Sequence, residues 1–316
     1  MAVVSPPPLG TSVAMGVRAA GKEAWLLPVG AVVALLRSAA LVPALAVGLA
    51  LPLEGAARAM RERPLSFVAP LEGALAVGTS VRYVALVAGL ALTGAALSAV
   101  LRVLYLAGAL PTLGARLAGD ASPRAFAAGV AWSLPRQLAT ALLAALAELA
   151  AAGYLLAATT GVLQAGAGEL SMERRLALAT LGALALAIGV AGLLVTRVLG
   201  DAAAARTAIL GERPGAAFAG AARGYLARPG AFTFGGLAFA VATIAVGSLL
   251  QPATAVLGQV AERLDGALML GPQLMLALVA ALGAAAVDLG WLGTVSALAC
   301  AEVEASPPPL PPRVSA

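Results

Sequence analysis

The chain has 316 residues, of which 61% are hydrophobic and only 11% are charged. This composition leaves too little polar surface to coat a soluble globule, so it excludes that class and predicts that lipid surrounds most of the chain. The formal net charge is +5, and arginine carries nearly all of the positive charge. Because the arginines lie between apolar stretches and form no continuous stripe, they favour anionic lipid head groups as partners and argue against nucleic acid.

The residue types that many enzymes and metal sites use are scarce. Histidine is absent and Cys300 is the single cysteine, which excludes the commonest general base, an intramolecular disulfide and a cysteine zinc cluster. The acidic residues are scattered along the chain, and no nucleotide-binding loop, nucleophile elbow or zinc motif occurs. The sequence therefore predicts a protein that is not an enzyme and that holds no metal or cofactor.

The start of the chain, residues 1–24, has no basic cluster ahead of an apolar core. It therefore differs from a cleaved signal peptide, and we expect a flexible cytoplasmic tail. Residues 52–80 mix apolar and charged side chains, so we expect them to lie on the membrane surface or to dip into it. A second tail, rich in proline, is expected at residues 301–316.

Six stretches are apolar over a length that suffices to cross a bilayer, for which about 20 residues are needed. They are residues 25–51, 83–110, 138–163, 176–199, 230–250 and 273–300. The predicted fold is therefore all-α: a polytopic integral membrane helical bundle of about six transmembrane helices, with interfacial amphipathic helices, over residues 25–300. Lysine and arginine are more frequent on the side that holds both termini, which places the termini in the cytoplasm.

One pattern precedes two of these spans. GDASPRAF begins at Gly119 and GERPGAAF begins at Gly211, and aligning them brings Phe126 to the position of Phe218. Each copy is expected to form a short amphipathic surface helix that runs into a span. A fainter echo, RERPLSFVAP, begins at Arg61.

The arginines of the two copies form the first candidate site. Lying next to apolar spans, they are suited to lipid phosphates, each basic residue contributing about 1 kcal/mol near an anionic leaflet. The alternative is that they only set the membrane topology. These candidate head-group ligands are Arg124, Arg136, Arg213, Arg223 and Arg228.

The two copies, GDASPRAF at Gly119 and GERPGAAF at Gly211, also carry a family resemblance. Each is a glycine and a charged turn, followed by a helix with a central phenylalanine and then an apolar span. This plan resembles six-helix bacterial membrane proteins of uncharacterised function, among them the membrane domain joined to some glycerophosphodiester phosphodiesterases. The resemblance covers residues 24–300. It includes no catalytic barrel, and Cys300 is followed by AEVE where the family suggests tyrosine and arginine, so it implies an architecture and no activity.

Charged residues inside the spans form the second candidate site, an intramembrane polar cluster of Arg37, Glu148 and Asp288. Each costs at least about 2.5 to 3.5 kcal/mol in hydrocarbon, so all three are expected to face the bundle interior. One hypothesis pairs Arg37 with Asp288 or Glu148 as a substrate or proton site. The alternatives are a purely structural ion pair, or an Arg37 that reaches the membrane interface.

Two functions follow from these sites. The first is a non-enzymatic scaffold or partner subunit of the bacterial inner membrane, whose interfacial helices bind lipid. The second is a small secondary transporter or channel that uses the intramembrane cluster, which the repeats favour. The expected partners are membrane lipids, and either another membrane protein or a second copy of the chain.

Overall fold

A computed structural model describes residues 9–64, 66, 68–78, 80–119, 124–166, 172–261 and 266–305. All regular secondary structure in these ranges is helical, and six of the helices are long and apolar enough to cross a membrane. The predicted all-α class and the number of candidate spans are thereby confirmed. The helices are α1 (Leu9–Lys22), α2 (Leu26–Glu62), α3 (Ala69–Gly78), α4 (Val81–Leu117), α5 (Arg124–Gly166), α6 (Met172–Leu210), α7 (Pro214–Ala227), α8 (Pro229–Ala261) and α9 (Gly266–Ala305).

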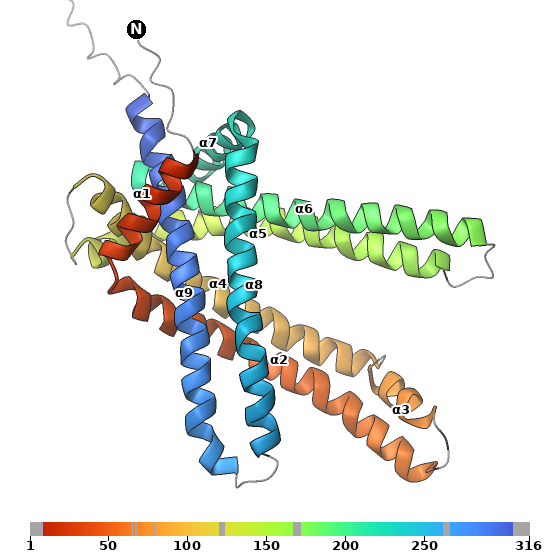
Figure 1. The fold of residues 1–316 in the computed structure, drawn as a ribbon. Coiled ribbons are helices and arrows are strands. Elements are labelled where there is room, and N and C mark those ends of the chain that lie inside the picture. Colours follow the sequence, from red (N-terminus) through yellow and green to blue (C-terminus); the bar gives the residue numbers. More distant parts are fainter. Residues whose placement is uncertain are drawn as a thin grey trace, which may run out of the picture.

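The long helices form three hairpins, which diverge from one region where they meet (Figure 1). The first hairpin pairs α2 with α4 and carries α3 at its tip, the second pairs α5 with α6, and the third pairs α8 with α9. We call the region where they meet the hub. It is built mainly by residues 102–114 of α4, 198–208 of α6 and 285–299 of α9.

The hub holds most of the buried side chains of the described residues. Leu110, Leu113, Leu292 and Val295 are almost fully enclosed there. Small residues allow this packing: the alanines at 202–205 of α6 let neighbouring helices approach closely, as small residues do in membrane bundles.

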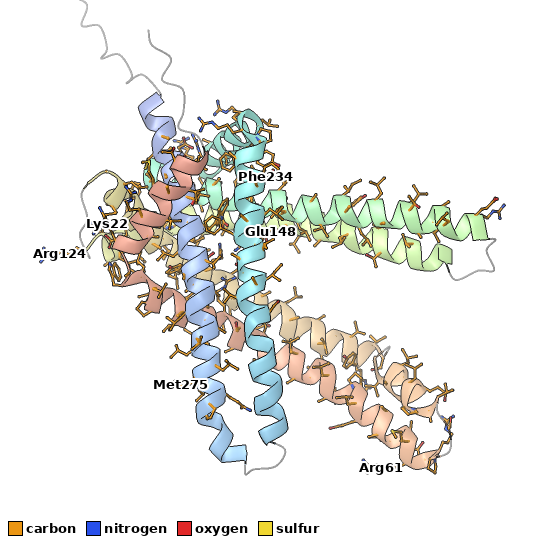
Figure 2. The ribbon with its side chains drawn as sticks, viewed as in Figure 1. Lys22, Arg61, Arg124, Glu148, Phe234 and Met275 are labelled. Carbon is orange, nitrogen blue, oxygen red and sulfur yellow. The ribbon has the colours of Figure 1, made fainter. Side chains whose placement is uncertain are left out.

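The hairpin ends outside the hub, which we call the arms, are apolar on the outside as well. Leu49, Leu92, Leu149 and Leu274 are examples of large side chains that the fold leaves exposed. Figure 2 shows such side chains projecting all along the arms, with Arg61 at the far end of the first hairpin. Contact between such surfaces and lipid chains costs no free energy, whereas contact with water is unfavourable.

A helical segment precedes each hairpin and packs against the second long helix of another hairpin. The backbone of α1 meets that of α9 so closely that a Cβ at Gly16 would collide with Gly293. The first turns of α5 lie on α4, where Phe126 covers Gly108, and α7 lies on α6. Because α1 packs on the last helix, the three units close into a ring.

The tail expected at residues 1–24 is in part a helix. The structure places α1 at Leu9–Lys22, where Ala19 and Ala20 are buried and Ala20 belongs to the core of the hub. Short side chains at Ser12 and Gly16 allow contact with α9, which accounts for an ordered helix where we predicted a flexible tail. At the other end α9 continues to Ala305, and residues 306–316 lie outside the described ranges.

Residues 52–80, predicted to lie on the membrane surface or to dip into it, form the end of α2 and the short helix α3, and their place at the membrane stays a prediction. The long helix α2 continues through Pro52 to Glu62, and α3 packs along its last turns. The two helices touch at Gly55 and Gly73, where a Cβ on either glycine would strike the other backbone. The segment therefore lengthens the first hairpin and adds no further leg. The fainter echo that begins at Arg61 lies at the tip of the first hairpin. Its position in the fold therefore differs from that of either repeated copy.

The two copies of the repeated pattern fold differently. The Gly211 copy gives the separate helix α7, which ends before Arg228, and α8 begins at Pro229. The Gly119 copy does not give a separate helix, because α5 runs unbroken through Pro135. A residue ahead of proline is disfavoured in the helical region, and Arg228 has left it, with φ −145° and ψ 58°.

Candidate functional site

The centre of the hub holds an ion pair between α4 and α6. A guanidinium nitrogen of Arg102 lies 2.9 Å from Oδ1 of Asp201, and the other lies 3.4 Å from Oδ1 of Asp288 on α9. Asp201 also accepts a hydrogen bond of 3.0 Å from Nε1 of Trp291. One guanidinium thus joins three of the long helices.

Two more arginines extend this network. Arg197 lies one helical turn before Asp201, with its Nε 3.6 Å from that carboxylate, and its terminal nitrogen lies 3.7 Å from Glu148 on α5. Arg37 on α2 donates a hydrogen bond of 3.1 Å to the Ser98 hydroxyl. We call these six ionisable residues the central polar cluster: Arg37, Arg102, Glu148, Arg197, Asp201 and Asp288. Figure 2 places Glu148 in the region where the hairpins meet.

The cluster is electrically balanced, with three guanidinium groups and three carboxylates. The innermost pair is buried, because the side chains of Arg102 and Asp201 are only 11% and 7% exposed. A buried charge without a partner is strongly destabilising, whereas a paired and hydrogen-bonded one is tolerated. The arrangement therefore keeps paired charges in a buried part of the protein.

Two cavities adjoin the central polar cluster. Cavity A, of about 310 Å³, lies among α2, α4, α6, α8 and α9, and cavity B, of about 280 Å³, lies among α2, α4, α5 and α6. Four members of the cluster line both cavities: Arg37, Arg102, Arg197 and Asp201. Asp288 lines cavity A alone and Glu148 lines cavity B alone. The buried ion pair therefore belongs to the wall that the two cavities share.

The remaining walls of the two cavities differ. Cavity A is mostly apolar, with Phe239 and Trp291 packed at a ring-centroid distance of 5.5 Å. Cavity B has Gln137 and Thr140 in its wall beside the shared charged groups. Gln137 donates 2.7 Å to the Ala204 carbonyl, and Thr140 shares a 3.0 Å hydrogen bond with Thr207. These bonds fix α5 on α6 beside cavity B.

The three residues predicted as an intramembrane cluster do come together at these cavities. Arg37 lines both, and Glu148 and Asp288 each line one. The predicted pairing was wrong, because no ion pair joins Arg37 to either acid among the described residues. The arginines that pair with these acids are Arg102 and Arg197.

Sequence reasoning missed half of the cluster. The predicted cluster did not include Arg102 and Arg197, and Asp201 lies beyond the predicted span at residues 176–199. In fact α6 continues to Leu210, which brings Asp201 into the hub. A signal was present: Arg197 and Asp201 are spaced four apart and therefore share one face of a continuous helix.

The five predicted head-group arginines do not form one site. Arg213 and Arg223 are exposed along α7, and Arg228 is half-buried at its end. Arg136 donates 3.0 Å to the Gly211 carbonyl and lies over the Trp132 ring at 5.2 Å. Arg124 begins α5 and is exposed, on another part of the surface from α7 (Figure 2).

Further ion pairs hold the short helices to the hub. Glu23, directly after α1, is buried and pairs with Arg116 of α4, while Trp25 donates 2.7 Å to the same carboxylate. Arg206 of α6 donates two hydrogen bonds, of 2.9 and 2.6 Å, to the carboxylate of Glu212, which precedes α7. These contacts join the segment after α1 to α4 and the segment before α7 to α6.

Within the described ranges, no three acidic, cysteine or histidine side chains gather closely enough to hold a metal ion. Comparison with protein-family models, with curated proteins and with solved structures gives no match for this chain.

Proposed function

We propose that this chain is a non-enzymatic, multi-pass protein of the bacterial inner membrane that binds a small polar solute at the central polar cluster and moves it across the bilayer. It would be a small secondary transporter or channel with both termini in the cytoplasm. The observation that carries this proposal is that six ionisable side chains from five apolar helices line two adjoining cavities.

The energetic cost of the cluster supports this function. Ionisable side chains within membrane segments are rare, and they commonly mark substrate or ion pathways. A pair that served only packing is replaceable by apolar side chains with little loss or with a gain in stability. The presence of six charged groups in the hub therefore favours a role in binding or transport over a role in packing alone.

The geometry suggests how a solute would pass from one cavity to the other. Arg102 has two carboxylate partners on different helices, Asp201 at 2.9 Å and Asp288 at 3.4 Å. A solute that competes for Arg102 in cavity A weakens the wall that separates it from cavity B. Movement of the hairpins as rigid units about the hub then exposes one cavity and afterwards the other, as in transporters built from structural repeats.

Flux measurements test this proposal. The purified protein is reconstituted into liposomes loaded with a bacterial metabolite extract, and the retained metabolites are quantified by mass spectrometry. We expect selective loss of one or a few polar metabolites, and no such loss with Arg102→Gln or Asp201→Asn. A protein that leaves every metabolite in place, or variants that release the same ones, would contradict the proposal.

The scaffold function remains a second candidate, favoured by the surface of α7. Arg223 is exposed there one helical turn before the exposed apolar side chain of Leu226, and Arg213 is exposed at the N-terminal end of the helix. This combination suits a helix that lies on an anionic lipid surface. Gentle extraction followed by quantitative mass spectrometry tests it: a stoichiometric protein partner that the variant R213Q/R223Q no longer retains would support a scaffold.

A further inference from the structure

Arg37 differs from the other arginines of the central polar cluster. Arg102 and Arg197 each pair with two carboxylates, whereas the hydrogen bond that Arg37 makes among the described residues goes to the neutral hydroxyl of Ser98. Arg37 lines both cavities. A guanidinium has five donors in a planar fork that matches a carboxylate or a phosphate, so most of its donors remain available to a ligand.

One polar group at cavity A has no hydrogen-bond partner. Tyr105 is 5% exposed, and its hydroxyl makes no hydrogen bond in the structure. The hydroxyl lies beside Gly30 and Ala285, and all three residues line cavity A. A buried hydroxyl without a partner costs free energy, and a ligand oxygen in the cavity would satisfy it.

The charges around cavity A favour an anion. Three guanidinium groups and two carboxylates line it. Arg102 and Arg197 are paired with carboxylates, Arg197 also with Glu148 beyond the shared wall, so Arg37 is the guanidinium at this cavity for which the described residues supply no carboxylate. Arg37 would attract a bound carboxylate or phosphate and would repel a cation.

The size and the apolar wall of cavity A restrict the rest of the ligand. Its volume of about 310 Å³ equals that of about ten water molecules at ~30 Å³ each. Leu194, Val198, Phe239 and Trp291 supply apolar surface to its wall. A small anionic head on an apolar body fits both surfaces.

We propose that cavity A binds an amphipathic anion, with its phosphate or carboxylate held by the Arg37 guanidinium and the Tyr105 hydroxyl and its apolar body against α8 and Trp291. This inference rests on the proposed function and names the class of its solute. Such an anion is either a soluble compound or the head group of a membrane lipid.

The binding test uses Trp291, which lines cavity A. In the variant W25F/W132F it is the only tryptophan, since the chain has three. The full chain is placed in nanodiscs of zwitterionic lipid, and Trp291 fluorescence is followed during titration with hexyl phosphate, hexanoate or hexylammonium. We expect the two anions to bind and hexylammonium to bind at least about tenfold more weakly, because the Arg37 guanidinium repels it.

Variants assign the binding groups. Arg37→Gln should weaken hexyl phosphate binding about tenfold, and Tyr105→Phe about threefold, because a charged hydrogen bond contributes more than a neutral one. Gly30→Ala places a methyl group 3.0 Å from the Tyr105 hydroxyl, and it should weaken binding even if Arg37→Gln does not fold. Arg82→Gln, an exposed arginine at the start of α4, is the matched control and should bind as the parent does.

The outcomes separate this inference from the proposed function. If hexylammonium binds as well as hexyl phosphate, or if Tyr105→Phe and Gly30→Ala both bind hexyl phosphate like the parent, the cavity is open to solutes but the anion assignment is wrong. If no probe of either charge changes Trp291 fluorescence, both proposals fail. When binding occurs, nanodiscs containing phosphatidic acid distinguish the source: loss of hexyl phosphate binding indicates a lipid head group, and unchanged binding indicates a soluble anion.

Discussion

The hub and the arms use the same few residue types, alanine, leucine, glycine and valine, yet only the hub is packed from several sides. Leu110 in the hub is fully buried, while Leu92 on the same helix is exposed. The ion pairs of the two regions differ in the same way, since the side chains of Arg63 and Glu72 at the arm tip are 59% and 52% exposed. Lipid solvates apolar side chains as well as protein does, so apolar character alone does not bring helices together. Polar bonds and close glycine contacts therefore decide where these helices meet.

The largest difference is expected when one carboxylate is removed from each region. Asp201→Ala leaves Arg102 in the hub without its nearest partner and should destabilise the protein by about 3–5 kcal/mol. Glu72→Ala breaks the exposed pair at the arm tip and should cost about 0–1 kcal/mol. Unfolding in mild detergent, followed by circular dichroism, measures both. Equal losses would mean that the buried network does not hold the hub together.

Shortening a leucine in each region tests packing alone. Leu110→Ala opens a cavity in the hub and should cost about 2–5 kcal/mol. Leu92→Ala only exchanges one lipid contact for another, so its unfolding midpoint should stay close to that of the parent. A large loss from Leu92→Ala would show that another protein surface covers this arm.

A third test concerns the contact between α1 and α9. Gly293→Ala places a Cβ against the backbone of Gly16, and overpacking of this kind costs about 1–3 kcal/mol. The matched control is Gly153→Ala, because that glycine of α5 has open space around it. Limited proteolysis should cut α1 faster in the first variant only. Equal rates for both variants would indicate that α1 does not pack on α9.

The smallest difference is expected for single hydroxyl groups. Thr140→Val removes the bond between α5 and α6 and should cost about 0.6 kcal/mol, the average for such bonds in membrane proteins. The hydroxyl of Thr180 bonds within its own helix and is exposed, so Thr180→Val should have no measurable effect. Unfolding midpoints of the two variants and of the parent provide the comparison. A cost for Thr180→Val that matches that for Thr140→Val would remove the distinction between hub and arm.

The sequence was sufficient to predict the long apolar helices but not the residues at which they end. Length and composition identify a membrane helix, because the bilayer requires about 20 apolar residues. They do not fix where the helix stops, since Leu26–Glu62 continues through Pro52 and past the predicted span. The short helix α1 was missed because its contact with α9 depends on small residues far apart in the chain, Gly16 and Gly293.

The central polar cluster was predictable in part for a similar reason. A charged residue in the middle of an apolar stretch, such as Arg37 or Asp288, is visible without a structure. The ion-pair partners of such a residue cannot be read from the sequence, because they depend on how the hairpins cross. Asp201 illustrates this: its place in the hub follows from the added length of α6 and from Arg102, 99 residues earlier in the chain.

Solvent access to the cavities tests the central claim most directly. In a Cys300→Ala background, single cysteines replace Ala34 in cavity A and Ala144 in cavity B, and Leu92 and Leu142 serve as exposed positions on the apolar surface. Each variant in liposomes is treated with a membrane-impermeant, sulfonate-bearing thiol reagent, and the labelled fraction is measured by mass. A solute cavity predicts rapid labelling at residues 34 and 144 and very slow labelling at residues 92 and 142. Equally slow labelling at all four positions would contradict the account and would reduce the central polar cluster to a packing device.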